Sequence, residues 1–405
     1  MPRSPLAGAV AMGAFWFFCL GGLGLFFPFF SLYLHENAGL AGWEFGAVMA
    51  VPPLVAMSAQ PLWGDFADRS GSRARVLGLL CLGAAVGYAS LSLGTGFASL
   101  LALTALMACF AMPMVPTAMS VTFAITQELG PNAFGWCRVW GTLGFGAAVV
   151  AFPWFLDALE AGAGLAAAPG GPSEPALGAM FPATGAVTLV AALIALALPR
   201  ADALALRAEH GEWRRLFAHA PYVRLLVVAL LGYLLVQGPM GLFPVFVRAH
   251  GGSLDSVSRL WILMLALEVP LIAFSGASLR RLGARGLLVT GLVAAGVRWL
   301  ICGFAPESVW VVPAQVLHGV TVAGLVIGGP LYVEAVVPGS LRSTGQNVLA
   351  MVGVSLGGLL SNLGAGALLD VAGADAPYQV GGIGALLVAT LLPWWLPPPS
   401  RASSD

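Results

Sequence analysis

Charge is scarce in this sequence. Only 9% of the 405 residues are charged, and all 18 basic residues are arginine, because lysine is absent. A soluble domain usually has about a quarter of its residues charged, so a water-soluble fold is excluded. The formal net charge of +0, with no clustered basic excess, also excludes a nucleic-acid-binding protein. The lack of lysine beside abundant alanine and glycine is typical of a high-GC bacterial gene.

Cysteine is also scarce, which limits the possible chemistry. The 5 cysteines form no CxxC pair, and no histidine lies at metal-ligand spacing. We therefore expect packing cysteines and no metal site. The 5 histidines are scattered, so we do not expect an integral-membrane enzyme, which needs acids, bases or metal ligands gathered together.

Apolar residues are abundant instead. They make up 59% of the chain, and the mean hydropathy is +0.90. A bilayer is spanned by roughly 20 apolar residues, so the length allows about twelve spans and no sizeable soluble domain. We predict an all-α polytopic membrane protein whose first apolar segment, without a cleavage site after it, is a span rather than a signal peptide. The twelve segments are 9–34, 44–63, 75–94, 98–122, 138–156, 178–198, 222–247, 257–278, 286–304, 309–333, 343–369 and 378–396.

The arginines outside these segments predict the orientation. With the N-terminus in the cytoplasm, the arginines outside the segments or at their ends fall on the cytoplasmic side, except Arg248 and Arg259. Cytoplasmic loops carry such an excess of basic residues. We therefore expect a multi-pass protein of the cell inner membrane with both termini cytoplasmic.

The most hydrophilic internal stretch divides the segments six and six. We predict an N-terminal six-helix bundle at 1–199, a cytoplasmic linker at 200–220 and a C-terminal six-helix bundle at 221–405. Landmark residues recur at a nearly constant separation in the two halves, which indicates an internal repeat. The pairs are Gly64 and Gly276, Gly71 and Gly283, Gly144 and Gly357, Asp157 and Asp370, and Pro28 and Pro244, separated by 212, 212, 213, 213 and 216 residues. Such a repeat predicts two pseudo-twofold-related bundles, as in one large class of secondary transporters.

The loop after the second segment resembles a known signature. Residues 64–73, GDFADRSGSR, resemble the helix 2 to 3 signature of the major facilitator superfamily, although Ser72 replaces the first of its two usual basic residues. We predict that this loop is a gating latch in which Gly64 permits close helix approach and Gly71 a tight reversal. The latch residues are Gly64, Asp68, Arg69, Gly71 and Arg73. In the second half Arg280 stands where Asp68 stands in the first, so the two latches cannot be identical.

Five further stretches resemble the phenylpropionate-permease and lactose-permease-like branch of this superfamily. They are residues 26–34, 134–141, 267–270, 298–299 and 317–321. The resemblance implies the superfamily fold and the transport of organic acids, sugars or nucleosides, generally with a proton.

Four ionisable residues are expected at membrane depth, where each is costly and a functional candidate. They are Glu268, Arg298, His318 and Arg138. We predict that Glu268 binds the coupling proton, that Arg298 is its counter-ion or the anchor of a substrate carboxylate, and that His318 is a relay or hydrogen-bond partner. The alternatives are a structural Glu268–Arg298 ion pair and a core histidine.

Arg138, Trp16, Phe27 and Thr321 are the predicted substrate-binding residues. The sugar-permease pattern has a carboxylate late in helix 4 and another one turn beyond the helix 10 histidine. In this chain the only polar residues late in the fourth segment are Thr117, Ser120 and Thr122, and Thr321 stands at the position one turn beyond the histidine. A galactoside-type site is therefore disfavoured, and Arg138 favours an anionic substrate. For Arg138 an interface role, and for the aromatic residues lipid contact or packing, remain the alternatives.

Together these features predict a secondary active transporter rather than an enzyme. We expect a monomeric, proton-coupled symporter that imports a small organic solute, preferably an aromatic or other organic acid, by alternating access where the halves meet. It needs no cofactor, since the proton gradient supplies the energy. The alternatives are an exporter acting as a drug or metabolite/H+ antiporter, a sugar or nucleoside symporter, and a receptor that binds without transport.

Overall fold

The computed structural model describes residues 5–130, 133–166, 171–198, 212–273 and 275–398. Within these ranges the regular structure is helical, and no strand is found. Contacts divide the chain into two compact units, one comprising Met1–Ala205 with Leu254–Arg259 and the other Leu206–Ser253 with Leu260–Asp405. Most of the predicted linker, residues 199–211, lies outside the described residues.

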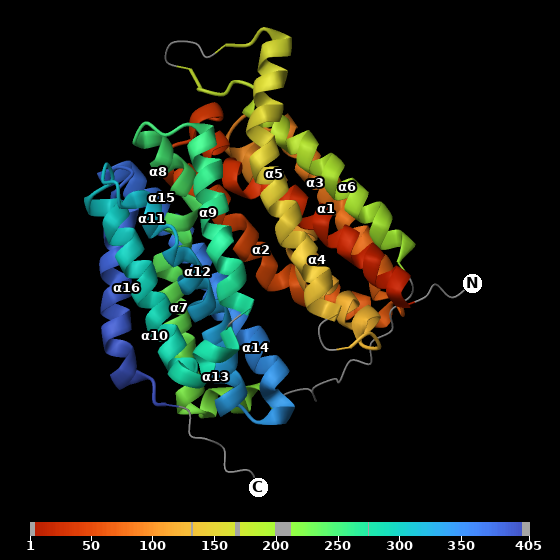
Figure 1. Cartoon of the computed structure of the whole chain (residues 1–405), viewed down its shortest axis with the longest axis vertical. Coiled ribbons are helices and arrows are strands. Elements are labelled where there is room, and N and C mark those ends of the chain that lie inside the picture. The colour runs from red at the N-terminus through yellow and green to blue at the C-terminus, as the bar shows by residue number, and fades with distance from the viewer. Residues whose placement is uncertain (1–4, 131–132, 167–170, 199–211, 274, 399–405) are drawn as a thin grey trace. The chain divides into compact units, whose positions relative to one another are not determined.

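The first unit is built from six long helices, red to yellow-green in Figure 1. In this unit α1 packs on α5 and α6, α2 on α4, and α3 on α4 and α6. The helices are α1 (Pro5–Leu32, continued by the π-helical η1, Tyr33–Asn37), α2 (Gly42–Arg69), α3 (Arg73–Ser90), α4 (Phe97–Thr126), α5 (Ala133–Ala163) and α6 (Met180–Ala197).

The second unit contains the remaining helices, green to blue in Figure 1, apart from residues Leu254–Arg259, which group with the first unit. Several of these helices are interrupted. The α7 helix packs on α15 and α16, and α10 packs on α12 and α16. The helices are α7 (Ala220–Gly241), α8 (Phe243–Ala249), α9 (Leu254–Ala273), α10 (Ser275–Phe304), α11 (Val311–Ala314), α12 (Leu317–Val322), the π-helical η5 (Ala323–Ile327), α13 (Gly328–Val336), α14 (Arg342–Ala350), the π-helical η7 (Met351–Gly357), α15 (Gly358–Ala372) and α16 (Ala376–Trp395).

The structure confirms the polytopic all-α fold. Among the described residues, 11 helical stretches are long and apolar enough to cross a membrane. The predicted segment at 257–278 overlaps α9, which is not among these 11 stretches and which contains Asp255, Arg259 and Glu268.

Glycines bring equivalent helices together in each unit. In the first unit, a Cβ at Gly144 of α5 would overlap the carbonyl oxygen of Phe17 in α1. In the second, a Cβ at Gly357 of η7 would lie 3.1 Å from the carbonyl oxygen of Leu230 in α7. Gly357 follows Gly144, and Leu230 follows Phe17, by the same 213 residues. Both partners of the contact therefore recur at one separation, which extends the repeat from the sequence to helix packing.

The repeat also extends to backbone conformation at two turns. Gly71, between α2 and α3, has φ 66°, and Gly283, which interrupts α10, has φ 67°. Only glycine adopts this left-handed region without a steric penalty. The two residues are 212 apart. The break between the predicted segments 257–278 and 286–304 therefore shares a glycine of positive φ with the α2–α3 turn.

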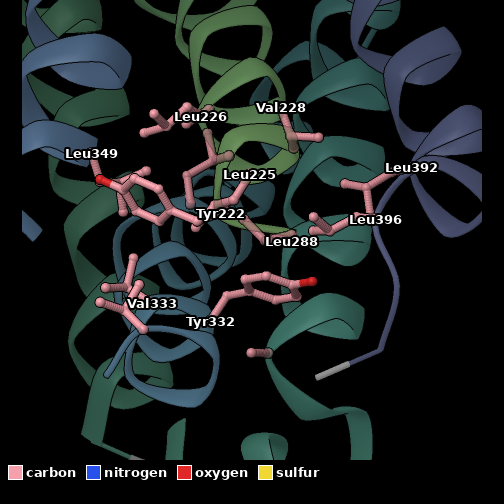
Figure 2. Close-up of a cluster of buried hydrophobic side chains, with 14 of the residues drawn as sticks. Tyr222, Leu225, Leu226, Val228, Leu288, Tyr332, Val333, Leu349, Leu392 and Leu396 are labelled. Atoms are coloured by element: carbon pink, nitrogen blue, oxygen red, sulfur yellow. The ribbon is translucent and has the colours of Figure 1, made fainter. Parts of the chain in front are cut away.

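The core at one end of the second unit is shown in Figure 2. Apolar side chains of α7, α10, α13 and α16 surround Tyr222 and Tyr332, which are both fully buried. Each phenol hydroxyl donates to a backbone carbonyl, Tyr222 to Gly345 at 2.8 Å and Tyr332 to Pro397 at 2.7 Å. These bonds satisfy polar groups that would otherwise be costly to bury.

Candidate functional site

The centre of the candidate site is a buried arginine in the second unit. Arg298 of α10 is only 1% exposed. Its Nε donates to Gln315 Oε1 at 2.8 Å, and its Nη2 faces the sulfur of Met264 at 3.3 Å. Its guanidinium carbon also lies 4.2 Å from the ring centroid of Trp299 and 5.4 Å from that of Phe243. Aromatic rings attract cations, so these contacts offset part of the cost of burying the charge.

His318 of α12 connects this arginine to a carboxylate. Its Nδ1 lies 3.1 Å from Arg298 Nη1, and its Nε2 lies 3.6 Å from Glu268 Oε2 on α9. Arg298 therefore belongs to a continuous row of polar side chains that also contains Gln315, His318 and Glu268. The row is drawn from α9, from α10 and from residues 315–318. We call these four residues the polar row.

Exposure rises along the polar row. Gln315 is 0% exposed and Arg298 1%, whereas the side chains of His318 and Glu268 are 14% and 24% exposed. The carboxylate is therefore the open end of the row, and the positive charge is its enclosed end.

The structure thus brings together the three residues predicted for proton coupling. His318 contacts both of the other two, Arg298 through Nδ1 and Glu268 through Nε2. The sequence reasoning did not find Gln315. Its position three residues before His318 places it on the same helical face, which is the signal that could have found it.

A second cluster lies wholly in the first unit. Trp16 of α1 is fully buried, and its indole Nε1 donates to Thr122 Oγ1 of α4 at 2.9 Å. The guanidinium carbon of Arg138, from α5, lies 4.7 Å from the Trp16 ring centroid. The predicted substrate residues Trp16 and Arg138 are therefore neighbours, and Thr122 occupies the helix 4 stretch where the sugar-permease pattern has a carboxylate.

The other two predicted substrate residues lie in different surroundings. Phe27 is 41% exposed, whereas Trp16 on the same helix is enclosed. Thr321 is buried, and its hydroxyl donates to the carbonyl oxygen of Leu317 at 3.1 Å. The proton of this hydroxyl is therefore engaged within its own helical segment, which leaves the oxygen only as an acceptor.

The predicted latch between α2 and α3 is held by local ion pairs. Arg73 contacts Asp68 at 2.7 Å, and Arg69 contacts Asp65 at 2.8 Å. A Cβ added at Gly64 would meet nothing within 4 Å, so no close approach to a neighbouring helix is seen at this residue within the described structure. The residue lies on an exposed face of α2, so its space is open.

Arg285, which follows Arg73 by 212 residues, has a different role. Its Nη1 lies 3.3 Å from the carbonyl oxygens of Pro393 and Leu396 at the C-terminal end of α16. Basic side chains commonly satisfy the last carbonyls of a helix in this way. The two loops are therefore not identical, as the sequence predicts, although the side chain of Arg280 itself lies outside the described residues.

A helical repeat of membrane-spanning segments that encloses ionisable residues is typical of secondary transporters. The family model described as the MFS_1 like family matches residues 9–380, so the chain belongs to this family of the major facilitator superfamily. It is a multi-pass membrane transporter, and no catalytic family is indicated.

Similar proteins support this assignment. The chain is 29% identical over 358 residues to the maltose permease of Geobacillus stearothermophilus, covering 88% of this chain and 86% of that one. It is 33% identical to the probable 3-phenylpropionic acid transporter of Escherichia coli (strain K12), but over only 78 residues, 19% of this chain and 21% of that one. The crystal structure of a mutant of the nucleoside transporter NupG has the same fold, with a TM-score of 0.84, 16% identity and coverage of 96% and 100% of the two chains.

Proposed function

We propose that this protein is a proton-coupled symporter that imports a small organic solute by alternating access, with Glu268 as the proton-binding group. The observation that carries the proposal is the polar row, in which a partly exposed carboxylate is linked through His318 to an enclosed guanidinium. Ionisable residues inside membrane-spanning helices commonly mark proton pathways.

The charges of the row explain how a proton can drive a conformational change. When Glu268 is ionised, its negative charge compensates the positive charge of Arg298. When Glu268 takes up a proton, the row carries one uncompensated positive charge. In a region of low dielectric constant such a change alters the relative free energies of conformations that hydrate the row differently. Protonation at Glu268 therefore biases one conformation over the other, which is the requirement for coupling.

Two substrate classes are supported by separate observations. The guanidinium of Arg138, over the ring of Trp16, supplies a positive charge beside an aromatic surface, which suits an aromatic or other organic acid. The likeness to a maltose permease over 88% of the chain favours a sugar instead. We test both classes, with 3-phenylpropionate and maltose as the probes.

We also propose that the protein lies in the cell inner membrane with both termini in the cytoplasm. The support is the distribution of arginine, since only Arg248 and Arg259 lie on the outer side in this orientation.

Uptake into proteoliposomes tests the coupling. Wild-type protein is expected to accumulate one of the two probes when the outside is acidic, and a protonophore is expected to abolish the accumulation. The Glu268→Gln variant keeps the size of the side chain but cannot release a proton, so we expect gradient-driven accumulation to fall to the level of protein-free vesicles.

The matched control is Asp255→Asn, which makes the same chemical change on the same helix. Asp255 pairs with Arg259 on an exposed face, outside the polar row. This variant is expected to accumulate the probe as wild type does. Accumulation by Glu268→Gln equal to that of Asp255→Asn contradicts the proposal.

A further inference from the structure

The carboxamide of Gln315 has only one favourable orientation. Its Nε2 donates to the carbonyl oxygen of Val311 at 2.7 Å, and its Oε1 accepts from Arg298 Nε at 2.8 Å. Backbone carbonyls only accept hydrogen bonds, and a guanidinium only donates them. Exchanging the amide oxygen and nitrogen would therefore place two acceptors together at one end and two donors at the other. Gln315 is fully buried, so water cannot relieve either conflict.

This orientation in turn determines where the guanidinium of Arg298 points. With Nε held by Gln315, the plane of the guanidinium directs Nη1 at His318 Nδ1, 3.1 Å away. Its Nη2 is directed at the sulfurs of Met264 and Met240, at 3.3 and 3.6 Å. All three nitrogens of Arg298 are thus assigned to partners in an enclosed space.

The contact with Arg298 determines the protonation of the histidine ring. Since Nη1 can only donate, Nδ1 of His318 must offer its lone pair, and the proton of the neutral imidazole lies on Nε2. That nitrogen faces Glu268 Oε2 at 3.6 Å. The charged groups that face the ring are Arg298 from α10 and Glu268 from α9, and the ring of Trp261 lies edge-on at 6.5 Å. Arg298 therefore donates to His318 Nδ1, and the Nε2–H group of His318 points at Glu268.

We propose that Gln315 is a positioning residue that, through Arg298, holds His318 as the neutral tautomer with its proton on Nε2, so that the Nε2–H group faces Glu268 and His318 does not accept the coupling proton. The significance for transport rests on the proposed role of Glu268. The tautomer itself does not depend on that role.

One mechanistic consequence follows for the coupling step. An N–H group that points at Glu268 Oε2 from 3.6 Å is too far away for a hydrogen bond, but its dipole favours the ionised form of the Glu268 carboxyl electrostatically. A proton that arrives from water binds a Glu268 oxygen, weakens the contact with His318 and leaves the histidine neutral. The coupling proton is therefore held on Glu268. His318 does not take up this proton but connects the carboxylate to the buried guanidinium of Arg298.

Nitrogen NMR of the purified full chain labelled with 15N-histidine tests the proposal. The two ring nitrogens have well-separated shifts that distinguish the tautomers and the doubly protonated ring, and His318→Gln identifies the resonances of residue 318. At neutral pH we expect one species in the wild type, with Nδ1 unprotonated and Nε2 protonated. A wild-type spectrum with a proton on Nδ1, or with a mixture of tautomers, overturns the proposal without any variant.

Two substitutions test the part played by Gln315. Gln315→Met has a similar length but no acceptor for Arg298, so we expect a mixture of tautomers or a doubly protonated ring. Gln315→Glu restores an oxygen acceptor at this position, so we expect the single wild-type tautomer to return. An unchanged histidine signal in a folded Gln315→Met protein overturns the positioning role. If Gln315→Met does not fold, a loss of the single tautomer in Gln315→Glu overturns it.

The control is Gln379→Met. Gln379 of α16 also donates through its amide to a backbone carbonyl, that of Gly303 at 2.7 Å, but it does not belong to the polar row. Its substitution is expected to leave the signals of His318 unchanged. Because these spectra need no proton gradient, they separate this proposal from the coupling proposal. Glu268→Gln can lose or keep driven uptake whether or not the tautomer is as expected.

Discussion

At the scale of single residues, the enclosed polar groups are supported by partners from distant parts of the chain. Trp16 and Thr122 are 106 residues apart, yet the indole of one donates to the hydroxyl of the other. The same hydroxyl donates to the carbonyl oxygen of Ala118 at 2.6 Å within α4. Thr122 therefore holds the ring over which Arg138 lies, and its loss should affect both stability and the first-unit cluster.

Thr122→Val is expected to destabilise the protein by about 1 kcal/mol, because it leaves a buried indole N–H without its acceptor. Thermal unfolding of the purified protein measures this change. The matched control is Thr104→Val on the same helix. The Thr104 hydroxyl is also fully buried but has no hydrogen-bond partner within the described structure. Its replacement should be neutral or stabilising, and equal losses from both substitutions would contradict the assigned role of Thr122.

At the scale of helices, glycine contacts decide how closely neighbouring elements pack. Gly144 in α5 faces the backbone of α1, and Gly357 in η7 faces α7. Because the neighbour at Gly144 is backbone rather than a flexible side chain, it cannot move away without displacing a helix.

Gly144→Ala is therefore expected to cost about 1–3 kcal/mol of stability through overpacking. Gly64→Ala is the comparison, since an added Cβ there meets open space. In an exposed helix interior that change should stabilise the protein by about 0.5–1 kcal/mol. Thermal unfolding of the two variants in the same detergent decides the matter. A Gly144→Ala protein as stable as wild type would show that α1 and α5 are not in such close contact.

Equivalent turns in the two halves have a similar backbone conformation, but the side chains beside them have different partners. Gly71 and Gly283 have nearly the same φ, whereas the arginines two residues later contact different groups. Arg73 contacts the carboxylate of Asp68 in its own loop, and Arg285 contacts the end of α16. The recurrence of glycine predicts the turn conformation, because φ depends on the residue itself. It does not predict the partner of a long side chain, which depends on what the fold places beside it.

At the scale of the whole molecule, the orientation in the membrane can be tested with paired cysteine substitutions. Glu307 lies between α10 and α11, on the predicted outer side, and Glu128 lies between α4 and α5, on the predicted cytoplasmic side; both are exposed. In intact cells a membrane-impermeant maleimide should label Glu307→Cys and leave Glu128→Cys unlabelled until the cells are permeabilised. The wild-type protein, with its own 5 cysteines, sets the background. The reverse labelling pattern would contradict the predicted orientation of the helices in the membrane.

Much of the fold could be predicted from composition and periodicity. Membrane segments are determined by local hydropathy, since about 20 consecutive apolar residues suffice to span a bilayer. The segment boundaries follow the helices closely, and the repeat was visible as glycine pairs at nearly constant separation. The interruptions, such as the π-helical turns of η5 and η7, could not be predicted, because they depend on packing against neighbouring helices.

The candidate site could be predicted only in part. Glu268, Arg298 and His318 were found because ionisable residues inside apolar segments stand out in any sequence. Gln315 has no charge and resembles many other polar residues, so its place in the polar row is seen only from its hydrogen bonds to Arg298 and Val311.

The sequence by itself determined that this protein spans a membrane, that it consists of two related halves and which ionisable residues are placed at cost inside them. The spans and the cost of the ionisable residues depend on the free energy of transferring each segment from water to lipid, which is a sum over nearby residues. The relation between the halves is seen from residues that recur at a nearly constant separation. Only the tertiary structure decided the order of contacts from Glu268 through His318 to Arg298. That order depends on the directions of donors and acceptors on separate helices, and these directions are set only when the helices pack.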